Sequence, residues 1–199
     1  LMIRRPPRST QGVSSAASDV YKRQTCNGLM FIVAGLTPPI VYLGLGPDGT
    51  GILNMARTEQ IFAYLFFSLP IAFMMTRRIQ TNYFIDSGLL ILVASMSMGM
   101  VADALGANIS FTDMSDAVAV TAYSSIMLGT SICGIGLLKT SIFPKWLSGL
   151  FTIIASISFI LLATGEPSDM DNNAFLIPVF LSVHLLMVVL GIFILRRSE

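Results

Sequence analysis

Six apolar stretches divide the chain, and each is bounded by charged or turn-forming residues. They cover about 27–46, 59–76, 84–104, 116–138, 145–164 and 174–195. Each is close to the roughly 20 residues that a helix needs to cross the hydrocarbon core of a bilayer. Soluble proteins also contain fully apolar core helices, but six in succession without a polar face would leave no surface for water. The pattern therefore predicts a polytopic membrane protein.

The spanning segments are predicted to be helices. Lipid offers the backbone no hydrogen-bond partners, which leaves helices or closed barrels as spanning structures. The alternation with a period of two that marks barrel strands is absent. We therefore expect an all-α fold, a transmembrane helix bundle of about six spans that forms a single unit over residues 25–199.

Lysine and arginine gather on one side of the predicted bundle. They follow the second and sixth stretches and join the fourth stretch to the fifth, whereas the other loops carry mainly acids. The residues concerned are Arg77, Arg78, Lys139, Lys145, Arg196 and Arg197. Bases beside a span are retained in the cytoplasm. We therefore expect both ends of the fragment inside, three loops outside, and a multi-pass protein of the cell inner (plasma) membrane.

Residues 1–24 stand apart from this pattern. Residues 2–10 and 14–24 look like translated sequencing-library adapter, read codon by codon from a flow-cell primer and a transposase read primer, with a barcode between them. We therefore expect residues 1–24 to be non-native and disordered and the native start to be missing, which leaves open further spans before residue 25. A basic, serine-rich targeting tail is the alternative.

Setting that segment aside changes the charge of the chain. The whole sequence has 12 basic and 11 acidic residues, whereas residues 25–199 have seven and ten, so the net charge changes from positive to negative. Nucleic acid is therefore not an expected partner. The lipid bilayer is, and another copy of the chain or another membrane subunit remains open.

His184 lies near the middle of the sixth stretch and is the only histidine. An ionisable group at that depth is a candidate for a proton relay or a ligand contact. The structural alternative is a neutral imidazole bonded to a neighbouring helix. Thr37-Pro38-Pro39 and Pro70 interrupt the first two stretches and predict bent helices, which can frame a binding site. The residues expected to line a cavity are His184, Thr37, Pro38, Pro70, Ser125 and Thr130.

Other polar positions have structural interpretations. Tyr42 is expected to anchor the first span at the outer interface, and Asp103 is expected to be hydrated at the outer end of the third. Stripes of small residues permit close helix packing, and two such stripes predict the seam between the fourth and fifth helices. They consist of Thr121, Ser125, Gly129, Cys133 and Gly136, and of Ser148, Thr152 and Ser156.

Residues 134–147, GIGLLKTSIFPKWL, resemble a segment of uncharacterised bacterial six-helix integral membrane proteins. The resemblance implies a bacterial inner-membrane location and transfers no activity or site residue. Neither a catalytic motif nor a cofactor or metal motif is present, so an enzyme is not predicted. Two classes remain open: a small-solute or proton-linked transporter or membrane sensor with a cavity around His184, and a structural or accessory subunit of a membrane complex.

Overall fold

A computed structural model describes residues 11–47, 49–171 and 173–197 of the chain, which form helices and turns and contain no strand. The main helices are α1 (Gln11–Pro38), the π-helix η1 (Pro39–Leu45), α2 (Met55–Phe66), α3 (Ser68–Ile79), α4 (Tyr83–Gly106), α5 (Thr112–Leu138), α6 (Lys145–Ala163) and α7 (Asn173–Arg197). Short 3-10 helices, η2 (Ile109–Phe111) and η3 (Pro167–Asp171), lie in two of the connections.

Six helical segments among the described residues are long and apolar enough to cross a membrane, when α1 is counted with η1 and α2 with α3. They are Lys22–Leu45, Met55–Ile79, Tyr83–Gly106, Thr112–Leu138, Lys145–Ala163 and Ile177–Arg197. The prediction of an all-α fold is confirmed, and six helical segments have the length and composition that spanning requires.

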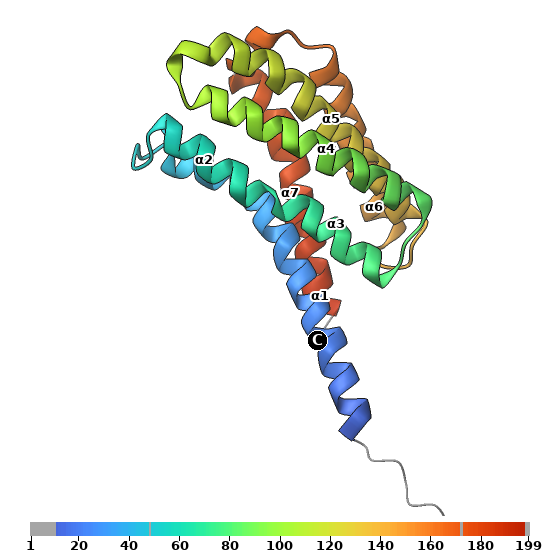
Figure 1. Cartoon of the computed structure of the whole chain (residues 1–199). Coiled ribbons are helices and arrows are strands. Elements are labelled where there is room, and N and C mark those ends of the chain that lie inside the picture. The colour runs from blue at the N-terminus through green and yellow to red at the C-terminus, as the bar shows by residue number, and fades with distance from the viewer. Residues whose placement is uncertain (1–10, 48, 172, 198–199) are drawn as a thin grey trace, which may run out of the picture.

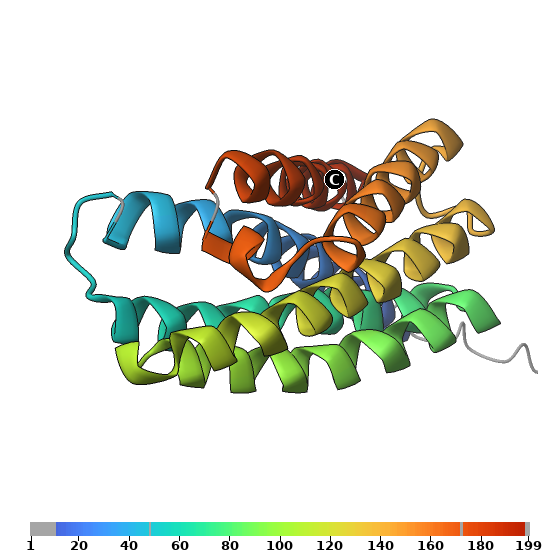
Figure 2. The same cartoon turned by 90° about the horizontal axis from the view of Figure 1, so that it is seen from above.

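The helices form one bundle in which neighbours in sequence are often neighbours in space (Figure 1). α4 packs along α5, and α5 along α6, while α1 packs along α7 from the other end of the sequence. α3 contacts α1 and α2 contacts α4, so the second span connects the two groups. Figure 2 shows the α1 and α7 pair on one side of the bundle and α4 and α5 on the other.

Prolines interrupt both of the first two spans, as expected. α1 changes into the π-helix η1 at Pro38-Pro39. In the second span, α2 ends at Phe66 and α3 begins at Ser68. Pro70 has no N–H to donate to the carbonyl group four residues earlier, and its ring crowds that carbonyl. The continuous hydrogen bonding of an α-helix is therefore lost just before Pro70.

Close helix contacts depend on glycine. A β-carbon on Gly88 of α4 would lie 2.7 Å from the backbone nitrogen of Cys133 in α5, and one on Gly28 of α1 would lie 2.9 Å from the carbonyl oxygen of Gly191 in α7. Real β-carbons do not approach other atoms so closely. The α1–α7 and α4–α5 seams therefore require glycine at these positions.

The predicted partner of the small-residue stripe in α5 was wrong in part. Gly129, Cys133 and Gly136 contact α4 rather than α6. α5 meets α6 through a different face, where the Oγ atoms of Ser131 and Ser156 are 2.6 Å apart. The reason is the helical period: at 3.6 residues per turn, position 131 faces away from positions 129, 133 and 136.

Residues 11–24 of the adapter-like segment form the first turns of α1. Their alanine, lysine and glutamine residues favour helix. In Figure 1 the first turns of α1 project beyond the other helices. Residues 1–10 lie outside the described residues.

Candidate functional site

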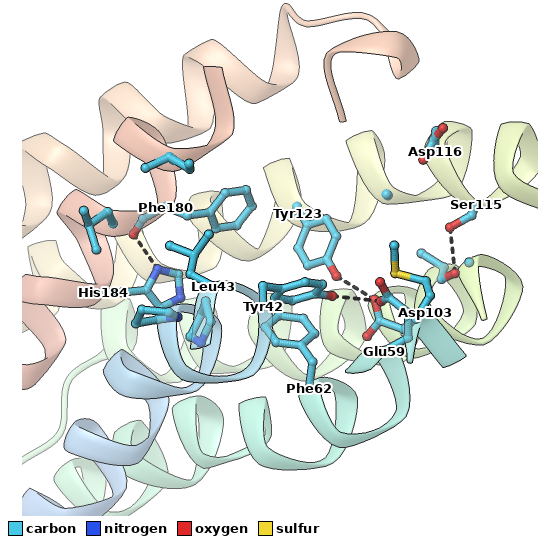
Figure 3. A pocket seen from close by; sticks show the side chains of 18 of the residues that line it. Tyr42, Leu43, Glu59, Phe62, Asp103, Ser115, Asp116, Tyr123, Phe180 and His184 are labelled. Carbon is cyan, nitrogen blue, oxygen red and sulfur yellow. Dashed lines mark hydrogen bonds between the residues drawn. The ribbon is translucent and has the colours of Figure 1, made fainter. Parts of the chain in front are cut away.

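A pocket of about 430 Å³ lies between η1, α2, α4, α5 and α7 (Figure 3). Its volume is within the range of small-molecule sites in proteins. The pocket lies toward the end of the bundle that carries the loops after η1 and α4. Its lining consists of Pro38, Pro39, Tyr42, Leu43, Met55, Glu59, Phe62, Ala102, Asp103, Gly106, Thr112, Ser115, Asp116, Ala119, Tyr123, Ile177, Phe180, Leu181 and His184.

Two tyrosine–carboxylate pairs lie at one end of this pocket. The hydroxyl group of Tyr42 in η1 donates a hydrogen bond of 2.8 Å to Glu59 in α2. The hydroxyl group of Tyr123 in α5 donates a hydrogen bond of 2.6 Å to Asp103 in α4. Figure 3 shows Tyr42 and Tyr123 pointing toward the two neighbouring carboxylates. Four separate elements thus position two carboxylates beside each other.

The expectation that Asp103 is hydrated was wrong, because its side chain is only 7% exposed. Asp103 lies one turn before the end of α4, and the next helix folds back over it. Ser115 of α5 donates a hydrogen bond of 2.8 Å to the carbonyl oxygen of Ala102, which fixes the start of α5 against the end of α4. Asp103 therefore faces its neighbouring helices.

Local capping also determines where Glu59 lies. The side chain of Asn54 accepts a hydrogen bond of 2.9 Å from the backbone N–H of Arg57 and so begins α2 at Met55. An asparagine in this position satisfies an N–H that the helix itself leaves without a partner. Glu59 then falls in the second turn of α2, where it meets Tyr42.

Aromatic rings form a closed circuit next to the carboxylates. Successive ring centroids lie 5.0 Å apart for Phe62 and Phe66, 5.4 Å for Phe66 and His184, 5.8 Å for His184 and Phe180, 5.6 Å for Phe180 and Tyr123, and 6.3 Å for Tyr123 and Phe62. These distances are typical of interacting aromatic pairs. All but Phe66 line the pocket. Part of the pocket wall is thus aromatic.

His184 lies at the end of the pocket away from the carboxylates (Figure 3). The ring is fully buried, and its Nδ1 atom donates a hydrogen bond to the carbonyl oxygen of Phe180 one turn earlier. Its Nε2 atom is also buried and has no hydrogen-bond partner among the described residues. In the neutral ring this second nitrogen is an acceptor. His184, which belongs to the pocket wall, therefore has one buried polar atom without a hydrogen-bond partner among the described residues.

The charges around the pocket have one sign. Glu59, Asp103 and Asp116 line it, and no lysine or arginine is among the described lining residues. The hydroxyl groups of Tyr42 and Tyr123 orient two of these carboxylates but carry no charge to neutralise them. In a medium of low dielectric constant, two neighbouring carboxyl groups such as those of Glu59 and Asp103 favour a positively charged neighbour.

The structure brings two of the six predicted cavity residues into the pocket, Pro38 and His184. Thr37 is buried beside them, and its hydroxyl group donates a hydrogen bond of 2.7 Å to the carbonyl oxygen of Val33. Three of the predicted residues do not line the pocket, namely buried Pro70, half-buried Ser125 and buried Thr130.

Reasoning from the sequence missed the carboxylates and tyrosines. Tyr42 was expected to be an interfacial anchor, whereas its hydroxyl group binds Glu59. One signal was present: Glu59 begins the predicted second span, Asp103 ends the third and Asp116 begins the fourth. All three positions therefore belong to the same end of the bundle, which allows them to converge.

No family model, curated protein or solved structure matches this chain. Its function must therefore be inferred from the pocket, whose chemistry combines an apolar aromatic wall with a small set of buried polar groups. That combination is typical of small-molecule sites.

Proposed function

We propose that this protein is an integral membrane protein that binds a small solute in the pocket, as a transporter or a membrane sensor. One observation carries the proposal: polar groups from five elements converge on a space of about 430 Å³ between apolar helices. Polar groups inside a membrane bundle are costly and are usually functional. A structural or accessory subunit would not require polar groups around a pocket.

Interrupted helices at the site support the same function. The π-helix η1 begins at Pro39 and contributes Pro39, Tyr42 and Leu43 to the pocket wall. π-helical segments are frequent at functional sites, and broken spans frame the substrate sites of many transporters. The interruption places Tyr42 opposite Glu59.

The distribution of bases supports an orientation. Arg77, Lys139 and Lys145 lie at helix ends, at the end of the bundle opposite the pocket, and we propose that this end is cytoplasmic. Both ends of the fragment are then inside, in a bacterial inner membrane, which agrees with the resemblance of residues 134–147. The pocket then lies toward the outer face.

Ligand-induced stabilisation tests the proposal. Cys133 is buried, so a thiol-reactive fluorogenic dye reports thermal unfolding of the purified protein in detergent. A solute that binds the folded state alone raises the unfolding temperature, by an amount that grows with the ratio of its free concentration to its dissociation constant. We expect small cationic, neutral or anionic solutes, screened as a panel, to include at least one that stabilises the protein.

A variant that fills the pocket localises the effect. Ala119 is 6% exposed and lines the pocket, so Ala119→Phe should abolish the stabilisation by occupying the space of the solute. Leu150→Phe, at a 41% exposed position of α6, is the matched control and should retain it. Equal stabilisation of both variants would show that the solute binds elsewhere and would refute the proposed function.

A further inference from the structure

We infer that the occupant of this pocket is an organic cation, held between the paired carboxylates of Glu59 and Asp103 and the aromatic wall. The inference rests on the proposed function, because it names the chemical class of the bound solute. Four properties of the pocket support it: the sign of its charges, the character of its wall, its size and an unsatisfied atom of His184.

The charged side chains that line the pocket are all acidic. Glu59 and Asp103 each accept a hydrogen bond from a tyrosine, at 2.8 and 2.6 Å respectively. A tyrosine hydroxyl group fixes the direction of a carboxyl group and supplies no counter-charge. Among the described residues that line the pocket, neither lysine nor arginine supplies a counter-charge. A cationic solute would supply it.

The aromatic wall selects the type of cation. Tyr42, Phe62, Tyr123 and Phe180 all line the pocket, and the Tyr42 and Phe62 centroids are 5.1 Å apart. The face of an aromatic ring attracts a cation, most strongly where water is excluded, and aromatic cages are used to bind quaternary ammonium groups. A large, weakly hydrated ammonium fits this wall better than a compact, strongly hydrated ion does.

The size of the pocket agrees with an organic solute. A volume of about 430 Å³ is far more than one inorganic ion requires, and much of the wall is apolar, with Leu43, Ala119 and Ile177 among its residues. Burial of the hydrocarbon part of an organic cation against these side chains is favourable. An organic cation therefore matches both parts of the pocket: its charged group pairs with the carboxylates, and its hydrocarbon part packs against the apolar side chains.

The unsatisfied Nε2 atom of His184 is an independent indication of a ligand. It is buried, belongs to the pocket wall and has no partner among the described residues. Leaving a buried polar atom without a hydrogen bond costs about 1–3 kcal/mol. A bound molecule with an N–H or O–H group, or a water that accompanies it, would satisfy this atom.

Three probes of matched shape test the charge requirement in the unmodified chain. They are phenethyltrimethylammonium, its neutral isostere in which a tertiary alcohol replaces the ammonium, and the anion phenylpropionate. Dissociation constants come from the concentration dependence of the unfolding temperature in the thiol-dye assay. We expect the cation to bind at least about tenfold more tightly than the alcohol, and the anion to bind more weakly still.

Isosteric variants test the carboxylates. Glu59→Gln and Asp103→Asn keep the side-chain shape and remove the charge, so each should weaken cation binding about tenfold and leave alcohol binding unchanged. Asp113→Asn is the matched control, because Asp113 is an exposed carboxylate of α5 outside the pocket wall. Unfolding curves without ligand show whether each variant is folded.

The outcomes separate this inference from the proposed function. Alcohol or anion binding as tight as cation binding would overturn the organic cation and leave a solute-binding pocket in place. Unchanged cation affinity in folded Glu59→Gln and Asp103→Asn would also overturn it. If no solute of the wider panel stabilises the unmodified protein, the proposed function itself fails.

Discussion

The hydroxyl group of Tyr123 and the carboxylate of Asp103 are joined by a hydrogen bond of 2.6 Å that connects α5 to α4. It lies at the opposite end of these helices from the contact between Gly88 and Cys133. α4 and α5 are thus connected by a hydrogen bond near the pocket, and they pack closely at Gly88 toward their other end.

Removing this hydroxyl group should destabilise the protein. A hydrogen bond to a charged group contributes about 1.5–3 kcal/mol, so Tyr123→Phe should lower the free energy of unfolding by an amount of this order. Tyr64→Phe is the control, because Tyr64 is 62% exposed on α2. Chemical unfolding in detergent measures both. Equal effects of the two variants would contradict a specific role for the Tyr123–Asp103 pair.

Gly35 should tolerate no side chain. A β-carbon there would overlap the backbone carbonyl oxygen of His184 and lie 2.9 Å from the backbone nitrogen of Val188. Gly35→Ala should therefore separate α1 from α7 and cost about 1–3 kcal/mol of stability, as overpacking does.

The matched control for this substitution is Gly99→Ala in α4. The nearest atom to a β-carbon at that position would be the Cδ1 atom of Ile126 at 3.7 Å, an ordinary contact. Because alanine favours helix over glycine by up to about 1 kcal/mol, Gly99→Ala should be neutral or stabilising. If Gly35→Ala unfolds at the same temperature as Gly99→Ala, the α1–α7 seam is less tightly packed than the structure indicates.

Replacing His184 by leucine should separate binding from folding. The substitution removes both the Nε2 atom, which has no partner among the described residues, and the Nδ1 hydrogen bond to the carbonyl oxygen of Phe180, so the two effects should offset and leave the stability of the empty protein about unchanged. Stabilisation by the solute should fall, because the pocket wall loses the Nε2 atom of His184.

Thr130→Val is the matched control for His184→Leu. The hydroxyl group of Thr130 is also buried without a partner in the described part of the chain, but Thr130 does not line the pocket. We expect solute binding to be unchanged in Thr130→Val and reduced in His184→Leu. If both variants bind the solute as the unmodified protein does, His184 has a structural role alone.

Single cysteines should reveal the orientation of the bundle. In a background of Cys26→Ser and Cys133→Ala, Thr50→Cys should react with a membrane-impermeant maleimide on intact cells. Thr81→Cys, in the loop beside Arg77 and Arg78, should react only after permeabilisation. Both positions are exposed. The reverse labelling pattern would place the base-rich end outside and refute the proposed orientation.

Local sequence properties were sufficient to predict the six spans and their interruptions. Hydropathy over twenty residues and the missing N–H of Pro70 depend on nothing distant in the chain. The pocket could not be predicted in this way, since whether Glu59 and Asp103 meet depends on how far each helix is rotated about its axis. The small residues around Gly129 show the same limit: their pattern predicted close packing, but the choice of α4 over α6 was set by the assembled bundle.

The break between α2 and α3 also has a mechanical consequence. Glycine seams hold α1 against α7 and α4 against α5, whereas α2 is a separate helix of 12 residues, about 18 Å long, that ends beside Phe67. It carries both Glu59 and Phe62. A change in the tilt of α2 about Phe67 would therefore move a carboxylate and an aromatic ring together, and would change the width of the pocket without unpacking either seam.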